Sequence, residues 1–236
     1  MTRFRAAERQ RAEALQLLSH DMRAPQVSIL TLLDGPAPRL DPMVERHIAD
    51  YARQTLDLAE GYVQLARAES QPYRSELLDL GQVAMDAADI LWPQASKKGV
   101  RILTPDGEEE FLVQGDPALL RRLTTNLLDN ALKYGPEGGV IQVSLTGAEE
   151  DGRPVCVLSV SDQGPGLSEE AARRLFQAFG HGGADHRGAG LGLAFVRTVA
   201  ERHGGTIRHQ PGSPGATFIL TPVSYTHLRA HETSLH

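Results

Sequence analysis

The chain has one cysteine, no long hydrophobic run and no excess of positive charge among its 236 residues. The single cysteine, Cys156, excludes an intramolecular disulfide and is typical of a reducing compartment. No apolar run approaches the ~18 residues of a membrane-spanning helix, and no signal peptide is visible. The net charge of -6 argues against a nucleic-acid partner, which a basic surface would attract. We therefore expect a cytoplasmic protein, or the cytoplasmic part of a longer, membrane-bound one.

The N-terminal third carries two series of mostly apolar positions spaced alternately three and four residues apart, which is a heptad pattern. The first series is Leu15, Leu18, Met22, Pro25, Ile29 and Leu32; the second is Val44, Ile48, Tyr51, Thr55, Leu58, Tyr62 and Leu65. The turn-rich sequence DGPAPRLD separates them, so we expect an antiparallel helical hairpin. Each helix has one apolar stripe, and a second copy of the hairpin would bury both stripes in a four-helix bundle.

The sequence SHDMRAPQ places a reactive pair, His20 and Asp21, in the middle of the first helical pattern. His20 lies two residues from each of the heptad positions Leu18 and Met22, so its side chain is expected on the outward face. Pro25 removes a backbone N–H and leaves the carbonyl of Asp21 without its helical partner, which predicts a local bend. An exposed histidine on a helix usually has no function, so this pattern alone decides nothing.

From about residue 75 the hydrophobic period changes, and helices alternate with strands. We expect helices over 81–98, over 117–134, from Ser168 and over 191–203, and strands near 100–104, 111–114, 140–146, 155–161, 206–210 and 216–221. Asp116 as N-cap and Pro117 at the first position mark the start of the second of these helices. The mixture of elements, with hairpin turns at EEDG and GSPG, predicts an α/β sandwich.

Helix 117–134 carries the sequence NLLDNALKYG, in which polar side chains line up beside the apolar face. Asn126, Asn130 and Lys133 follow one another at helical spacing. Amide oxygens are hard ligands that suit Mg²⁺, which takes few protein ligands, and a lysine complements phosphate charge. The pattern favours a metal–triphosphate site, but asparagines on a solvated helix face would give the same spacing.

Three glycine-bearing clusters follow this helix. DQGPGL places Asp162 at the end of a strand, and Gly164 and Gly166 allow a flat ligand to approach the backbone; a tight turn is the plain alternative. GAGLGLAFV opens a helix whose N–H groups can hold phosphate, and GATFIL lies on the last strand. Between DQGPGL and GAGLGLAFV, the sequence LFQAFGHGGADHRGAG has the composition of a lid over a nucleotide, or of an ordinary surface loop.

The order of these motifs resembles the ATP-binding domain of sensor histidine kinases, and SHDMRAPQ resembles the phosphoacceptor sequence of the same family. The resemblance implies an α+β protein with two domains. A helical hairpin in residues 1–72 would form a dimeric four-helix bundle, and residues 73–223 would form an α/β sandwich that binds ATP, of the Bergerat type. Residues 224–236 have neither period nor turn pattern and look non-native, so we expect them outside the fold.

The resemblance also implies a role for each motif residue. His20 would accept the γ-phosphoryl group, and Asp21 would take or orient the imidazole proton. Asn130 would bind Mg²⁺, Asp162 would accept a hydrogen bond from the adenine amino group, and Arg187 would stabilise transferred charge or remain a solvated lid residue. The whole nucleotide site would comprise Asn126, Asn130, Lys133, Tyr134, Asp162, Gly164, Gly166, Arg187, Gly188, Gly190, Leu191, Gly192 and Thr217.

Two positions refine this expectation. Gyrase-like ATPases, mismatch-repair proteins and anti-sigma serine kinases, which share the fold, typically carry a glutamate four residues before the metal-binding asparagine. Here that residue is Asn126, which cannot take a proton, so phosphoryl transfer is favoured over hydrolysis. The acceptor sequence has Met22, Ala24 and Gln26 in place of three usual residues. Ala24 offers no polar group to hold a water one turn after the histidine, which predicts weak phosphatase activity.

We therefore expect a homodimeric sensor histidine kinase of a two-component system. It would use ATP and Mg²⁺ to phosphorylate His20, and would then pass the phosphoryl group to an aspartate of a response regulator. The alternative is a catalytically silent module that binds ATP and dimerises. The chain opens directly into the helical pattern RFRAAERQRAEALQ, as expected of a fragment of a longer protein.

Overall fold

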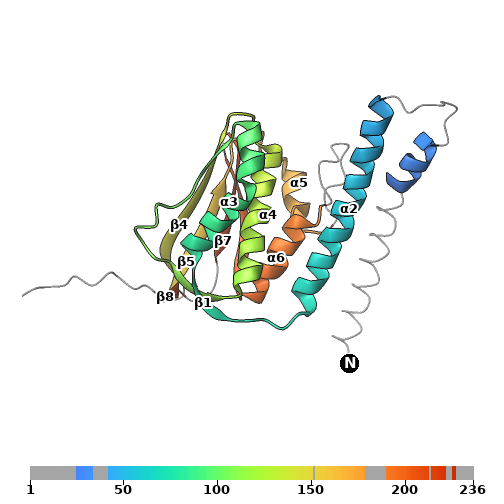
Figure 1. Cartoon of the computed structure of the whole chain (residues 1–236). Coiled ribbons are helices and arrows are strands. Elements are labelled where there is room, and N and C mark those ends of the chain that lie inside the picture. The colour runs from blue at the N-terminus through green and yellow to red at the C-terminus, as the bar shows by residue number, and fades with distance from the viewer. Residues whose placement is uncertain are drawn as a thin grey trace, which may run out of the picture. The chain divides into compact units, whose positions relative to one another are not determined.

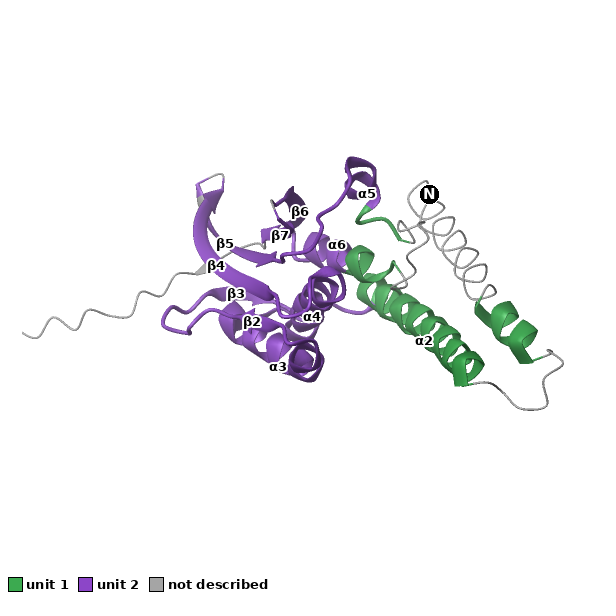
Figure 2. Ribbon diagram, turned by 90° about the horizontal axis from the view of Figure 1, so that it is seen from above, with its two compact units in different colours: residues 1–70, 175–195 green, residues 71–174, 196–236 purple. Residues whose placement is uncertain are grey.

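The computed structural model describes residues 25–33, 42–150, 152–178, 190–212, 214–221 and 225–226. The chain divides into two compact units, which Figure 2 shows in different colours. The first unit contains residues 1–70 and 175–195, and the second contains residues 71–174 and 196–236. Within the described ranges, no helix is long and apolar enough to cross a membrane.

The first unit contains a helical segment, residues 25–33, and the long helix α2 (Pro42–Ser70). Figures 1 and 2 both show residues 25–33 beside the first part of α2. All seven positions of the second heptad series are buried or half-buried, and Leu58 and Leu65 are the most enclosed of them. Gly61 lies close to Leu191 of the same unit: a Cβ at position 61 would be only 3.2 Å from the Leu191 side chain. The heptad prediction for α2 is therefore confirmed.

The second unit is built on a five-stranded sheet with the strand order β2-β4-β5-β7-β6. Its strands are β2 (Arg101–Leu103), β4 (Val140–Glu150), β5 (Arg153–Ser161), β6 (Thr206–Pro211) and β7 (Ala216–Thr221). Strands β2 and β4 are parallel, and the other neighbours are antiparallel. Because Ser161 pairs with Thr217, the end of β5 and the start of β7 meet at one edge of the sheet.

One face of this sheet is covered by helices α3 (Leu80–Lys98) and α4 (Pro117–Tyr134), together with the part of α6 (Gly192–Arg202) that belongs to this unit (Figure 1). The apolar side chains between the two layers are almost fully buried. They include Leu80, Leu120, Leu123, Leu127, Ile141, Leu158 and Phe218. The two-layer α/β sandwich that the sequence predicts is confirmed.

Local sequence sets where α3 and α4 begin and end. The Asp79 side chain accepts a hydrogen bond at the start of α3, and Gly99 ends that helix with a φ of +67°, a conformation that favours glycine. At the start of α4, the Asp116 side chain accepts from two backbone N–H groups, and Pro117 occupies the first position. The predicted helix starts and stops are therefore confirmed.

A second, three-stranded sheet contains two strands that the sequence pattern did not reveal. In it, β3 (Leu112–Gly115) lies between β1 (Glu76–Asp79) and β8 (Tyr225–Thr226). The tail 224–236 was expected outside the fold, and the structure differs at these two residues. The edge of β3 that β1 leaves unpaired offers N–H and C=O groups, with which an extended segment such as β8 can pair. The short helix α5 (Glu169–Arg174) follows Ser168, as expected.

Candidate functional site

The polar side chains predicted on α4 lie along one stripe of that helix. Asn126 and Asn130 are half-buried, and among the described residues no hydrogen bond engages either amide. Lys133 is further exposed, and its Nζ lies 2.7 Å from a carboxylate oxygen of Asp129, one turn earlier. Tyr134, the last residue of α4, has 38% of its surface exposed. We call Asn126, Asn130 and Lys133 the asparagine stripe.

The second part of the site is the turn that follows β5, residues 162–166, which we call the Asp162 turn. The backbone N–H of Asp162 donates to the carbonyl of Ala216, and this bond fixes the turn to the start of β7. One Asp162 carboxylate oxygen accepts from the Gly164 N–H at 2.7 Å. No hydrogen bond from a described residue reaches the other oxygen, so it can accept from a ligand.

The end of α4 and the Asp162 turn touch through Gly164. A Cβ at position 164 would lie 2.9 Å from the carbonyl oxygen of Tyr134 and 2.9 Å from the Asp162 carboxylate. Any side chain there would push the two segments apart. The contact therefore brings the asparagine stripe and the free Asp162 oxygen to neighbouring positions on the same end of the unit.

Two further glycines shape the wall behind the turn. Gly166 has a φ of +75°, and a Cβ there would meet the Gly215 carbonyl at 3.2 Å. Gly215 has a φ of +101°, and a Cβ there would lie 1.8 Å from the Asp162 carbonyl. The Thr217 hydroxyl lies 2.9 Å from that of Ser161 and makes no hydrogen bond to Asp162. Only backbone without side chains fits between the Asp162 turn and β7.

Comparisons with known proteins indicate which family this chain resembles. Residues 115–225 match the family described as histidine kinase-, DNA gyrase B-, and HSP90-like ATPase. The chain is 33% identical to the swarming motility regulation sensor protein RssA of Serratia marcescens, over 95% of this chain and 49% of that protein. It is 34% identical to the sensor protein CutS of Streptomyces coelicolor, over 84% of this chain and 49% of that protein. This chain carries the catalytic core of a sensor histidine kinase.

A solved structure supports the same assignment for part of the chain. The mycobacterial sensor histidine kinase MprB is similar with a TM-score of 0.57 and 27% identity, over 66% of this chain and all of that one. The chain spans about half the length of RssA and about half the length of CutS.

The residues at the Asp162 turn and the asparagine stripe fit the ATP of this kinase core. A free carboxylate oxygen can accept from the adenine amino group, and a side-chain-free wall admits a flat base. The amide oxygen of Asn130 would suit Mg²⁺, and the Asn126 amide, one turn earlier, would support the phosphates or the waters of the metal. The described residues contain no cluster of three or more His, Cys, Asp or Glu that could hold a metal. Mg²⁺ takes few protein ligands and usually keeps several waters, so one amide ligand is enough for it.

Other expected residues of the kinase core belong to the first unit or lie outside the described residues. Gly190 has a φ of +65°, Leu191 is buried, and Gly192 begins α6. These three residues group with the first unit. The positions of the phosphoacceptor pair His20 and Asp21, of Arg187 and of Gly188 lie outside the described residues.

Sequence reasoning missed several residues that organise the site. The Gln163 side-chain oxygen accepts from the Val140 N–H at 3.0 Å, which ties the Asp162 turn to the start of β4. Asp129 lies within the quoted motif, but its pairing with Lys133 was not considered. The spacing of four residues was the available signal for that ion pair, since such residues are neighbours on a helix.

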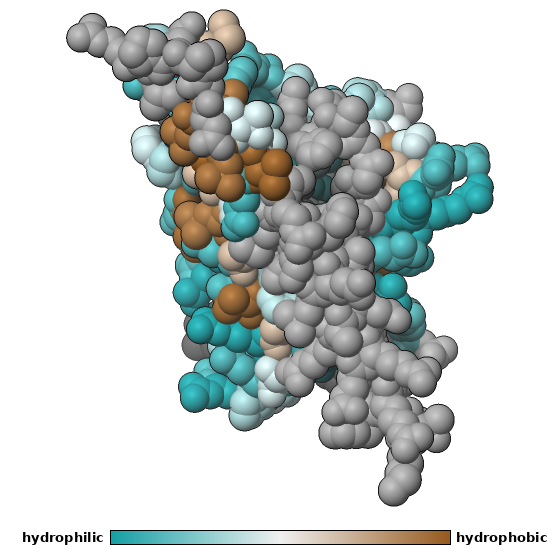
Figure 3. Space-filling model, turned by 90° about the vertical axis from the view of Figure 1, so that its right-hand side faces the viewer, coloured by the Kyte–Doolittle hydropathy of each residue, from teal (hydrophilic) through white to brown (hydrophobic). Residues whose placement is uncertain are grey.

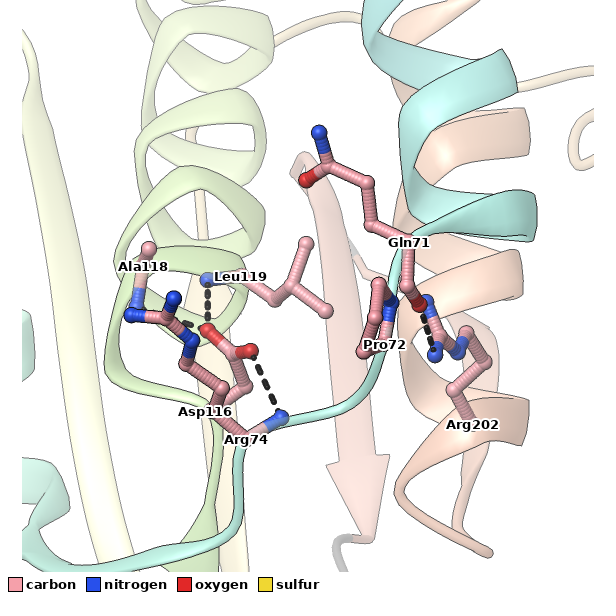
Figure 4. Close-up of a pocket in the computed structure, with 7 residues that line it drawn as sticks. All are labelled: Gln71, Pro72, Arg74, Asp116, Ala118, Leu119 and Arg202. Atoms are coloured by element: carbon pink, nitrogen blue, oxygen red, sulfur yellow. Dashed lines mark hydrogen bonds between the residues drawn. The ribbon is translucent and has the colours of Figure 1, made fainter.

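A pocket of about 520 Å³ lies at the opposite end of α4 from the Asp162 turn (Figure 4). Its walls are Gln71, Pro72, Arg74, Asp116, Ala118, Leu119 and Arg202. Figure 4 shows the Asp116 carboxylate reaching the backbone of both Leu119 and Arg74, and an Arg202 nitrogen donating to the carbonyl of Gln71 at 2.7 Å. These contacts fix residues 71–74 to the start of α4, and the pocket is separate from the Asp162 turn and the asparagine stripe.

His203 completes this junction from the end of α6. Its Nε2 accepts from the Asp116 N–H at 3.0 Å, so its Nδ1 carries the proton and donates to the Val199 carbonyl at 2.8 Å. The Tyr73 ring packs edge-on against it, with centroids 4.9 Å apart. Burial lowers the pKa of His203, while the hydrogen bond to Val199 and the charge of Asp116 oppose that shift. His203 is therefore a neutral structural residue at pH 7.

Proposed function

We propose that this protein is an ATP-dependent histidine kinase that phosphorylates its own His20. The contact at Gly164 carries this proposal, because it joins an adenine-type acceptor, Asp162, to a stripe that suits metal and phosphates. The sequence supplies a nucleophile, His20, with a carboxylate, Asp21, beside it. Relatives named as sensor proteins and histidine kinases support the same activity.

The proposed reaction is an in-line transfer. An imidazole nitrogen of His20 attacks the γ-phosphorus of ATP, and the bond from that phosphorus to the bridging oxygen of ADP breaks. ADP leaves with the electron pair, and Asp21 takes or orients the proton of the other ring nitrogen. Bound Mg²⁺, held by Asn130, would neutralise charge on the phosphates. Asn126 would support the phosphates or the waters of the metal. Lys133 would leave its ion pair with Asp129 and bind a phosphate oxygen instead.

Asn126 favours transfer over hydrolysis. An amide cannot accept a proton from water, so this site has no general base at the position one turn before Asn130. A nucleophile that arrives with its own carboxylate, as His20 does with Asp21, needs no such base. The rival interpretation is a silent module that binds ATP but has lost a group needed for transfer. None of the residues assigned to the acceptor pair or to the nucleotide site is missing from the sequence.

We also propose that the hairpin forms a homodimer and that the phosphoryl group passes to an aspartate of a response regulator. The helical segment 25–33 and α2 expose large apolar side chains: Val27, Leu30, Leu33, Met43, Leu56 and Val63. Figure 3 shows hydrophobic side chains gathered along these helices. A second copy of the same hairpin would cover them in a four-helix bundle.

The test is incubation with radiolabelled ATP and Mg²⁺, followed by the stability of the label in acid and in base. We expect an acid-labile, base-stable label in the wild type and in His47→Gln, a control at an exposed histidine of α2. His20→Gln should lose the label and keep its affinity for ATP. Undiminished label in His20→Gln would place the acceptor elsewhere, and ATP binding without label in the wild type would favour the silent module.

A further inference from the structure

One side chain at the C-terminal end of α3 forms hydrogen bonds with the backbone at the end of α4. Lys98, the final residue of α3, is half-buried, and its Nζ donates to the carbonyl of Leu132 at 2.5 Å and to that of Gly135 at 2.7 Å. In a continuing helix, the Leu132 carbonyl would accept from the N–H of residue 136. That residue is Pro136, which has no N–H, so the lysine supplies the missing donor.

A positive charge is well placed at this position. The end of a helix carries partial negative charge on its unpaired carbonyls, and an ammonium group there makes charge-assisted hydrogen bonds. No carboxylate of the described residues forms an ion pair with Lys98. Its charge is therefore directed at the carbonyls of α4.

The loop after α4 is held from the same side by the backbone. The Lys98 carbonyl accepts from the Gly138 N–H at 3.0 Å, and the Arg101 N–H donates to the Gly139 carbonyl at 3.0 Å. The next residue, Val140, donates to the side chain of Gln163 in the Asp162 turn. The end of α3 thus fixes both the last turn of α4 and the segment that leads to the Asp162 turn.

The two carbonyls that Lys98 binds flank the point where α4 meets the Asp162 turn. Tyr134 lies between Leu132 and Gly135, and its carbonyl is one of the two groups, with the Asp162 carboxylate, that leave room only for glycine at position 164. The position of this backbone sets the separation between the asparagine stripe and the Asp162 carboxylate. A nucleotide that engages both depends on that separation.

We propose that Lys98 is a positioning residue for the nucleotide. It holds the last turn of α4 against the Asp162 turn, so that adenine and phosphates are bound together, without touching the ligand itself. The proposal rests on the nucleotide site described above. Its ligand is a nucleoside di- or triphosphate; adenosine, which lacks phosphates, engages only the Asp162 turn and depends on Lys98 much less.

The experiment compares Lys98→Met with Lys97→Met, a matched loss of the neighbouring exposed lysine. ADP and adenosine compete against a fluorescent ATP analogue in the presence of Mg²⁺, and thermal unfolding is followed for each protein. For Lys98→Met we expect ADP affinity about tenfold weaker, or about 1.4 kcal/mol, and adenosine affinity within about twofold of wild type. Lys97→Met should bind both ligands as wild type does.

Lys98→Arg should restore ADP affinity, because a guanidinium can donate to both carbonyls. Wild-type ADP affinity in Lys98→Met would overturn the proposal, as would an equal loss for ADP and adenosine, which a general loss of stability produces. If Lys98→Met does not fold, Lys98→Gln, which keeps one donor, gives the same comparison. A wild type that fails to bind ADP would instead overturn the nucleotide site.

Discussion

Asp116 holds together the start of the helix that carries the proposed site. One carboxylate oxygen accepts from the backbone N–H groups of Ala118 and Leu119, each at 3.1 Å, and the other accepts from the Arg74 N–H at 3.2 Å. Its own N–H donates to His203. Only 9% of its surface is exposed, so water cannot easily replace these partners.

The change Asp116→Ala removes three hydrogen bonds and leaves the backbone bond to His203. Loss of an N-cap costs about 1 kcal/mol, and the unpaired Arg74 N–H costs about 1 kcal/mol more. The free energy of unfolding should therefore fall by about 2 kcal/mol, which lowers the Tm of a protein of this size by about 4–8 °C. Asp116→Asn keeps one oxygen for the cap and should lose about half as much.

Thermal and urea unfolding of both variants measure these differences, with Asp106→Ala as the control. Asp106 also accepts from a backbone N–H two residues later, but in an exposed turn, so its loss should change the Tm by less than about 2 °C. If Asp116→Ala unfolds within 1 °C of the wild type, or if Asp116→Asn is as unstable as Asp116→Ala, the cap and the linker bond do not stabilise this unit as argued.

Four further outcomes are expected. Gly215→Ala should prevent stable folding, because its Cβ would lie 1.8 Å from the Asp162 carbonyl, whereas Gly107→Ala, also at positive φ but with nothing within 4 Å, should cost about 1–2 kcal/mol in urea unfolding. Asp162→Asn should weaken the affinity for a fluorescent ATP analogue about 10- to 100-fold, because its amide oxygen would keep the turn while its NH₂ would face the adenine amino group. Unchanged affinity would show that adenine binds elsewhere. His203 has a lowered pKa when folded, so the unfolded chain binds more protons and stability should fall as pH drops below about 6.5; His203→Gln should flatten this profile, and an equally steep one would assign it to other groups. Ala24→Thr should increase the rate at which the protein, with ADP, removes phosphate from a phosphorylated response regulator; equal rates in the wild type would show that Ala24 does not limit that reaction.

The sequence predicted the elements whose signals are local. Asp116 and Pro117 mark the start of α4 because capping depends on residues within one turn, and Gly99 marks the end of α3 for the same reason. The four motifs and their order indicated the family without any knowledge of their contacts. Strand β1 was missed because it runs directly into α3 at Leu80 and pairs with β3, a distant segment of the chain. Strand β8 was missed because it pairs with the edge of β3 that β1 leaves unpaired.

Tertiary structure alone decided how the motifs meet. The hydrogen bond from Lys98 to Leu132 joins residues 34 positions apart, and the one from Asp116 to His203 joins residues 87 positions apart. The periodicity of a single helix cannot predict such long-range bonds. The fit of Gly164 under the Tyr134 carbonyl likewise depends on how α4 packs against the sheet. The sequence by itself therefore determined which chemical groups the protein has and on which elements they lie. Long-range packing determined which of those groups face one another, because backbone partners are chosen by proximity in the folded chain rather than by side-chain identity.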